Sequence, residues 1–159
     1  MAQKLTKKSK VAVKPVKTAP VKKNTQAMPK EFTSTVGRRK TAVARVRLWA
    51  GKSELIVNGK PASEYFKGEI FKKAYQQPFV LTGTLGQYTG SVKVEGSGIR
   101  AQIGALAHGV SRALAKIDAE KFKPLLREKG FLTRDSRMKE TRKVGQGGKA
   151  RAKKQSPKR

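Results

Sequence analysis

The side chains of this sequence best able to do chemistry are guanidinium and ammonium groups, and the chemistry that they suit is phosphate binding. An arginine fork grips two phosphate oxygens at once, whereas a lysine acts as a mobile point charge. These side chains gather just before and along one predicted strand, and again at the C-terminal end. The candidate phosphate ligands of this strand cluster are Arg38, Arg39 and Lys40, together with Arg45 and Arg47 on one face of the strand. Those of the C-terminal end are Arg134, Arg137, Arg142, Lys143, Lys149, Arg151, Lys153, Lys154, Lys158 and Arg159.

Two interpretations of the strand cluster compete. In the first, the arginines bind the phosphates of a polyanion and Trp49 stacks on a base or a ribose. In the second, the strand face is solvated and Trp49 packs against apolar neighbours. We favour phosphate binding for the arginines, because the guanidinium fork matches phosphate. For Trp49 we favour a place in the core, where a lone aromatic side chain among apolar residues usually lies.

A glycine-rich turn, Gly96-Ser97-Gly98, precedes a predicted helix. Free amides at a helix start, together with the helix dipole, suit an anion such as an RNA phosphate. The glycines could equally serve a tight turn at positive φ without any ligand, and the residues alone weigh the two interpretations about evenly. In either case we expect Gly98 to need a conformation or a close approach that a side chain forbids.

Nothing in the sequence predicts catalysis or a bound metal. His108 is the only histidine and there is no cysteine, so neither a zinc ligand set nor a nucleophile–histidine pair can be assembled. Gly51-Lys52-Ser53 looks like the end of a nucleotide-binding loop, but Val46 stands where that loop requires glycine, and we interpret the segment as a hairpin turn. We predict no enzyme activity, no cofactor and no metal. We expect His108 to be partly buried or in contact with RNA.

Charge points to the class of partner. The chain of 159 residues carries 38 Lys and Arg against 10 Asp and Glu, a formal net charge of +28. Such a protein would repel itself strongly, so a polyanion is the expected partner. No apolar run is long enough to cross a bilayer, and the N-terminal residues show no signal-peptide pattern. With the lack of cysteine, this predicts a nucleic-acid-binding protein of the cytoplasm that contacts no membrane.

The two ends of the chain are predicted to be disordered on their own. Residues 1–30 are rich in Lys and Pro and contain no acid, which predicts an extended arm. A transit peptide is the alternative, disfavoured because the first arginine is Arg38. Residues 133–159 have too few apolar side chains to offset their ordering entropy. We expect this extended basic tail to order against a polyanion; the alternative is a solvated tail that serves solubility.

Residues 31–132 are predicted to form one small α+β domain, in which a few antiparallel or mixed strands pack with helices. Alternation predicts strands over residues 41–50 and 88–95, and residues 54–57 are expected to pair with the first as a hairpin. Four helices are expected. The first covers residues 62–66, after the tight turn Asn58-Gly59 and Pro61, and the second covers 69–76, with Ile70 and Ala74 on one face and Pro78 ending it. The third covers 100–117, with an apolar stripe from Ile103 to Ile117, and the fourth covers 123–129 and is capped by Gly130.

Three stretches together resemble a known family. They are VGRRKTAVARVRL (residues 36–48), VEGSGIRAQIGALAHGVSRAL (94–114) and LREKGFLTRDSRMKETRKVG (126–145). Their spacing over about residues 29–159 is similar to that of the bacterial-type small ribosomal subunit protein nine. The strand-to-helix stretch and the FLTRDSR segment make the resemblance specific, because basic tails alone are common. The sequence departs from the family pattern at Ser97, Ala101 and Pro157.

The resemblance implies a compact α+β domain bound to small-subunit ribosomal RNA in the subunit head, beside neighbouring ribosomal proteins. It implies a tail that reaches the peptidyl site, where Lys158 and Arg159 approach the anticodon stem-loop of the bound transfer RNA. It adds to the predicted ribosomal-RNA-binding residues Gly96, Ser97, Gly98, Arg100, Gln102 and Arg112.

We therefore expect a structural constituent of the small ribosomal subunit without chemistry of its own. The alternative is a free nucleic-acid-binding regulator or chaperone. Salt-stable co-sedimentation with ribosomal subunits separates the two, because a regulator would dissociate or be found mainly on DNA.

Overall fold

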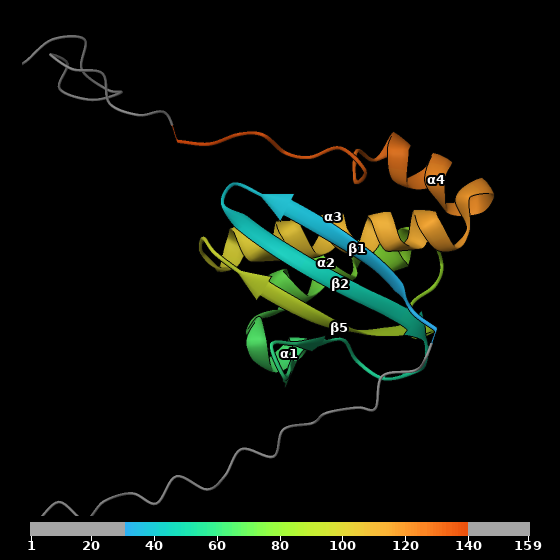
Figure 1. Ribbon diagram of the computed structural model, residues 1–159, viewed down its shortest axis with the longest axis horizontal. Helices are drawn as coiled ribbons and strands as arrows, with labels where there is room; N and C mark the ends of the chain where they lie inside the picture. Colours follow the sequence, from blue (N-terminus) through green and yellow to red (C-terminus); the bar gives the residue numbers. More distant parts are fainter. Residues whose placement is uncertain (1–30, 140–159) are drawn as a thin grey trace, which may run out of the picture.

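A curved sheet with helices on one face makes up the part of the chain that the structure describes. The computed structural model describes residues 31–139. It is an α+β fold with a five-stranded mixed sheet, as expected (Figure 1). The strands are β1 (Thr33–Arg39), β2 (Ala42–Ala50), β3 (Ile56–Val57), β4 (Lys60–Pro61) and β5 (Tyr88–Glu95), and the helices are α1 (Ala62–Tyr65), α2 (Glu69–Leu81), α3 (Ile99–Ile117) and α4 (Ala119–Glu128).

The strand order of the sheet is β1-β2-β5-β3-β4. β2 pairs antiparallel with β1 and with β5, and β3 pairs parallel with β5. The predicted hairpin of residues 54–57 with β2 is wrong, because β5 lies between them. Parallel pairing of β3 with β5 needs a long crossover, which β4, α1 and α2 supply. Gly51-Lys52-Ser53 is thus a loop between strands that do not pair, and the Gly51 amide donates to the carbonyl of Gln87 at 2.9 Å.

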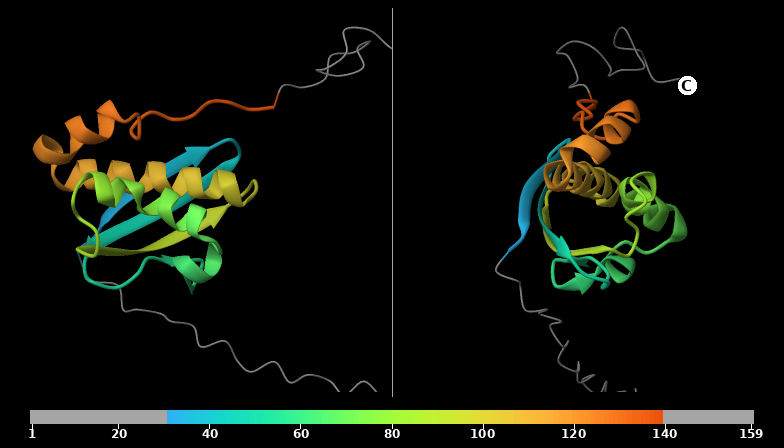
Figure 2. Two further views of the ribbon diagram at one scale, coloured as in Figure 1. Left: turned by 180° about the vertical axis from the view of Figure 1, so that it is seen from behind. Right: turned by 90° about the vertical axis from the view of Figure 1, so that its right-hand side faces the viewer.

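The core lies between the sheet and helices α2 and α3, which cover the same face (Figure 2). The alternation predicted for β2 and β5 is confirmed, since Ala42, Ala44, Val46, Leu48, Val92 and Val94 are all buried. The stripe of α3 is buried from Ile103 through Leu114, whereas Ile117 at its end is 37% exposed. Trp49 is half-buried on the opposite face of the sheet, outside the core cluster. Its predicted place in the core is therefore wrong.

Helix α3 packs unusually closely on β1, and two glycines make this possible. A Cβ atom on Gly37 would lie 1.9 Å from the Ala105 carbonyl oxygen and 2.3 Å from the Gly109 amide nitrogen. The hydroxyl of Thr35 donates to the carbonyl of Gly109 at 2.8 Å. A strand and a helix therefore meet backbone to backbone, at a distance that no larger residue allows.

Two helices differ from their predicted ends. α2 continues through Pro78 to Leu81, because the buried side chains of Tyr75 and Phe79 hold the turn around the proline against the core. α4 begins earlier than expected, where the Asp118 carboxylate accepts from the Lys121 amide at 3.1 Å. Ile70 is 81% exposed, so the predicted apolar face of α2 does not include it.

The predicted turns are found. Asn58 and Gly59 both have positive φ and join β3 to β4 as a two-residue turn. Gly130 follows the C-cap residue Lys129 of α4 with a φ of 72°, and its amide donates to the carbonyl of Arg127 at 3.0 Å. None of the helices among residues 31–139 is both long enough and apolar enough to cross a membrane.

Candidate nucleic-acid interface

Three separate segments meet at one end of the sheet (Figure 1). The β1–β2 turn and the β5–α3 turn lie side by side, since a Cβ on Gly96 would lie 2.5 Å from the Thr41 carbonyl oxygen. The segment after α4 arrives at the same place, where Arg134 Nη2 donates to the Lys40 carbonyl at 3.3 Å. We call this region the basic end; it comprises Arg38, Arg39, Lys40, Gly96, Ser97, Gly98, Arg100, Arg134, Asp135 and Arg137.

The β5–α3 turn of the basic end is tight. Gly96 and Ser97 have φ values of 80° and 52°, whereas Gly98 is extended at φ −100° and ψ 169°. A Cβ on Gly98 would meet nothing within 4 Å. The expectation that Gly98 forbids a side chain is therefore wrong, and the constraint falls on Gly96, whose positive φ and close contact both require glycine. Ser97 holds a left-handed conformation that glycine would adopt more readily.

The N-terminus of α3 opens at this turn without a side-chain cap. Gly98 is the N-cap residue, no side chain accepts a hydrogen bond there, and the first turn contains no acid. The first amides of a helix have no partner within it, and the dipole of a 19-residue helix adds partial positive charge. This geometry suits an anion. Gln102 braces the turn from inside, since its side-chain amide donates to the Gly96 carbonyl at 3.1 Å and its oxygen accepts from the Tyr65 hydroxyl at 3.2 Å.

The arginines of the predicted strand cluster do not all lie on one face of the sheet. Register places Arg38, Arg45 and Arg47 on the outer face, which faces away from the helices, and Arg45 lies beside Lys93 of β5. Arg39 points to the opposite face, toward α3. The outer face thus carries exposed cations on three strands, β1, β2 and β5. Lys93 is paired to Glu95 at 2.8 Å, and Arg47 lies 5.4 Å from the ring centre of Phe32. Hydrogen bonding to Lys93 lowers the pKa of Glu95.

Asp135 gathers two arginines on the inner side of the basic end. Its carboxylate pairs with Arg39 at 3.0 Å and with Arg137 at 3.0 Å. Arg137 donates to it from Nε, Nη2 and the backbone amide. These hydrogen bonds, chiefly those from the Arg137 side chain, hold the pKa of Asp135 far below its usual range. Sequence reasoning predicted the cations and missed the acid that organises them, although Asp135 stands between two arginines of the family's FLTRDSR segment.

His108 of α3 ties the helix to β1. Its Nδ1 accepts from the Arg38 amide at 3.3 Å, so this nitrogen is unprotonated in the bonded form. Burial is the main cause that lowers the pKa of His108, and the nearby charges of Arg112 and Arg134 add to it. Arg112 in turn donates to the carbonyl of Val36. Both side chains thus brace β1 against α3, which agrees with the partly buried position expected for His108.

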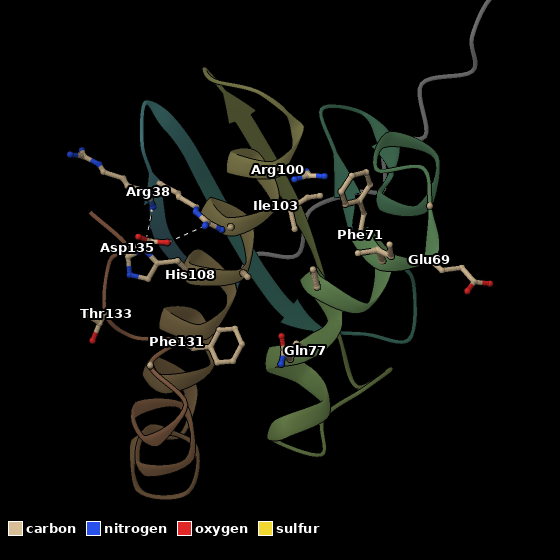
Figure 3. A pocket seen from close by; sticks show the side chains of 17 residues that line it. Arg38, Glu69, Phe71, Gln77, Arg100, Ile103, His108, Phe131, Thr133 and Asp135 are labelled. Carbon is tan, nitrogen blue, oxygen red and sulfur yellow. Dashed lines mark hydrogen bonds and ion pairs between the residues drawn. The ribbon is translucent and has the colours of Figure 1, made fainter. Parts of the chain in front are cut away.

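A hollow of about 760 Å³ lies between α2, α3 and the segment that follows α4 (Figure 3). Phe71 and Phe131 line it from different elements, Ile103 lies between them, and Arg38 and Arg100 stand at its margin. Half-buried and buried apolar side chains therefore line a hollow directly beside the cations of the basic end.

Comparison with known proteins settles the family. A family model described as ribosomal protein S9/S16 matches residues 37–159. The chain is 48% identical over 132 residues to "Small ribosomal subunit protein uS9" of Maridesulfovibrio salexigens, a match that covers 83% of this chain and 100% of that protein. The chain belongs to the ribosomal protein S9/S16 family. The resemblance inferred from the three sequence stretches is thereby confirmed.

Membership of the S9/S16 family establishes a structural role in the small ribosomal subunit. It makes the protein a ribonucleoprotein component in translation, with ribosomal RNA and other ribosomal proteins as partners. The family consists of structural ribosomal proteins and is not an enzyme family.

The predicted RNA ligands fall into those that the structure describes and those that lie outside the described residues. Exposed side chains at or near the basic end are those of Arg38, Lys40, Arg45, Arg47, Arg100 and Arg137, the last of which also pairs with Asp135. The side chains of Gln102 and Arg112 donate hydrogen bonds to backbone carbonyls within the protein. The predicted ligands outside the described residues are Arg142, Lys143, Lys149, Arg151, Lys153, Lys154, Lys158 and Arg159.

Proposed function

We propose that this protein binds ribosomal RNA in the head of the small subunit through its basic end and outer sheet face, and extends its C-terminal residues toward transfer RNA in the peptidyl site. The observation that carries the proposal is the convergence at one end of the sheet. Two turns, the uncapped start of α3 and the start of the C-terminal tail all meet there. Chain segments remote in sequence thus present their cations together.

The basic end suits RNA phosphates in two ways. Arg38 and Arg100 are exposed, and neither forms an ion pair with a carboxylate among residues 31–139. Their guanidinium forks can bind phosphate oxygens bidentately. The α3 N-terminus adds backbone amides and the helix dipole. Because the deep groove of an RNA helix hides its bases, such a surface recognises backbone position and shape.

The C-terminal tail continues from the basic end. Residues 140–159 follow directly on Arg137 and Lys139. If extended at about 3.3 Å per residue, 20 residues (159−140+1) span up to roughly 65 Å, enough to link the RNA contact to a distant site. Lys158 and Arg159 at the tip are the residues that we assign to the anticodon stem-loop of the transfer RNA. We place the protein in the cytoplasm, on the ribosome.

A salt series on reconstituted binding tests the interface. Arg38→Gln, Lys40→Gln and Arg100→Gln together should flatten the salt dependence of binding to small-subunit ribosomal RNA by about two units or more, since each neutralised phosphate contributes about 0.9 in a duplex. The matched control is Lys52→Gln with Lys72→Gln and Lys121→Gln, because these three lysines lie away from the basic end. An equal change in slope for both triple variants would contradict the assignment. Salt-labile association with subunits in a lysate, or recovery mainly on DNA, would favour the free regulator instead.

A further inference from the structure

We propose that Asp135 is a positioning residue, which latches the first residues of the C-terminal tail onto the basic end and holds the guanidinium groups of Arg39 and Arg137 in place for RNA. The inference rests on the proposed function, because it assigns to an acid a part in binding a polyanion. It gives the FLTRDSR segment a physical role.

The carboxylate of Asp135 is enclosed by its partners. Its side chain is 28% exposed, while that of Arg137 is 86% exposed. Arg137 donates to Oδ1 from its amide at 3.1 Å and from Nε at 3.0 Å, and to Oδ2 from Nη2 at 3.0 Å. Arg39 Nη2 reaches the same Oδ2 at 3.0 Å. One acid therefore joins the tail, through Arg137, to β1, through Arg39.

The chain on either side of Asp135 is held as well. Phe131 and Leu132 pack against the core cluster after the turn at Gly130. Arg134 then donates to the Lys40 carbonyl. The extended segment after α4 runs back past α3 to the basic end (Figures 1 and 2). Asp135 lies at the end of this path, near the start of the C-terminal tail.

Helix α3 makes room for the latch at Gly104. A Cβ there would lie 2.3 Å from Arg39 Cδ and 2.6 Å from Arg39 Nη1. Arg39 therefore lies across the helix at a point that carries no side chain. Figure 3 shows the ion pair between Asp135 and Arg39 beside the hydrogen bond between His108 and Arg38.

The latch and simple electrostatics predict effects of opposite sign. If charge alone mattered, replacing an acid beside RNA would strengthen binding, because the net charge rises by one. If Asp135 positions the tail, the same replacement weakens binding, since RNA must then order the tail and the two arginines itself.

The first test needs no RNA. The chain has no cysteine, so Met138→Cys and Lys52→Cys provide two unique sites for spin labels in the full chain. We expect a narrow distance distribution in the parent and a broad one in Asp135→Asn and in Gly104→Ala, which displaces Arg39 without changing charge. In the charge-swap variant, Arg39→Asp with Asp135→Arg, the distance distribution should be narrow again, because the ion pair is restored with its charges exchanged. Glu128→Gln, which removes the acid of the exposed pair with Lys129, is the control and should leave the distribution unchanged. An unchanged distribution in Asp135→Asn would overturn the latch.

The second test measures affinity for small-subunit ribosomal RNA at fixed salt. Asp135→Asn should bind about three- to tenfold more weakly than the parent, as expected for the loss of a charge-assisted network. Glu128→Gln should bind as the parent does or slightly more tightly. Asp135→Asn binding as tightly as Glu128→Gln, or a broadened distance distribution without loss of affinity, would overturn the proposal. If the parent itself fails to bind this RNA specifically, the proposed function fails, while the distance measurement still decides whether the latch exists.

Discussion

Gly37 and Gly109 set the distance between β1 and α3, and both arginines that precede the β1–β2 turn depend on that distance. Gly109 lies so close to β2 that its Cβ would come 2.7 Å from Val46 Cγ2. Arg38 and Arg39 follow Gly37 directly. A change in the spacing would therefore shift the hydrogen bond from Arg38 to His108 and the path of Arg39 across Gly104.

Gly37→Ala should destabilise the protein by about 3 kcal/mol, the upper end of the usual cost of overpacking, because the new methyl group meets backbone atoms on both sides. Gly98→Ala is the matched control, since that position is extended and open. It should change the free energy of unfolding by less than about 1 kcal/mol. Urea denaturation of the full chains measures both. Similar midpoints for the two variants would show that α3 can move away from β1 at little cost.

The close packing also explains why β1 was not predicted as a strand. Its inward residues are Thr33, Thr35, Gly37 and Arg39, none of them a large apolar residue. At Thr35 and Gly37 the backbone of α3 lies directly against the strand. The apolar alternation that identified β2 and β5 is therefore missing. A strand under a helix at this distance leaves no hydrophobic pattern in the sequence.

His108 gives the fold a dependence on pH. Burial lowers its pKa in the folded state below the value near 6.5 of the unfolded chain. Its contribution to stability is thus present above about pH 6.5 and is lost as the pH falls through the lower folded-state pKa. Urea unfolding should show a loss of stability from pH 7.5 to 5.5 in the parent and a smaller loss in His108→Gln. The carboxylates titrate mostly below this window, so equal losses in the two proteins would contradict the role of His108.

At the scale of elements, substitutions at the start of α3 can distinguish an effect on stability from an effect on RNA binding. Gly98 has the extended backbone of an N-cap residue and open space around its Cα. Gly98→Asn and Gly98→Asp should both stabilise the protein by a few tenths of a kcal/mol, roughly, through a new cap hydrogen bond. If an RNA phosphate occupies this helix end, Asp should reduce affinity about fivefold or more relative to Asn, in line with the ~1 kcal/mol that a charge is worth at a helix terminus.

The measurement pairs urea unfolding with affinity for small-subunit ribosomal RNA. Asn serves as the isosteric neutral control for Asp. Equal RNA affinity of the two variants would mean that no phosphate lies at the α3 N-terminus, and that the turn serves the fold alone.

The elements that sequence reasoning misplaced depend on long-range contacts. Residues 54–57 pair with β5 instead of the nearer β2, because the crossover returns β5 into the middle of the sheet. Pro78 ends no helix, since the core holds the following turn in place. By contrast, β2, β5, α3 and both turns at Asn58 and Gly130 follow from local pattern alone, and they were predicted.

At the scale of the molecule, charge predicted the class of partner but not the shape of the interface. The excess of cations implied a polyanion from composition alone. Strand register makes Arg38 and Arg39 point to opposite faces of the sheet. The path of the chain after α4 brings the start of the tail beside the β1–β2 turn. Both features depend on contacts between residues that are far apart in the sequence. Lys158 and Arg159 are separated from Arg137 by 20 residues of chain (138–157), so their contribution can be tested separately.

Lys158→Gln with Arg159→Gln should weaken binding of transfer RNA to the peptidyl site and leave subunit assembly nearly untouched. Each phosphate neutralised in a single strand contributes about 0.7 to the salt slope, so the slope should flatten by roughly one to one and a half units. The loss should extend across transfer RNAs, because phosphate contacts carry little sequence information. Substitution keeps the length of the chain. Lys7→Gln with Lys8→Gln removes the same charge from the other end and is the matched control. The measurement is binding of several deacylated transfer RNAs to reconstituted subunits across a salt series. An unchanged slope, a loss confined to one transfer RNA, or an equal effect of the control would show that these two residues do not contact the phosphates.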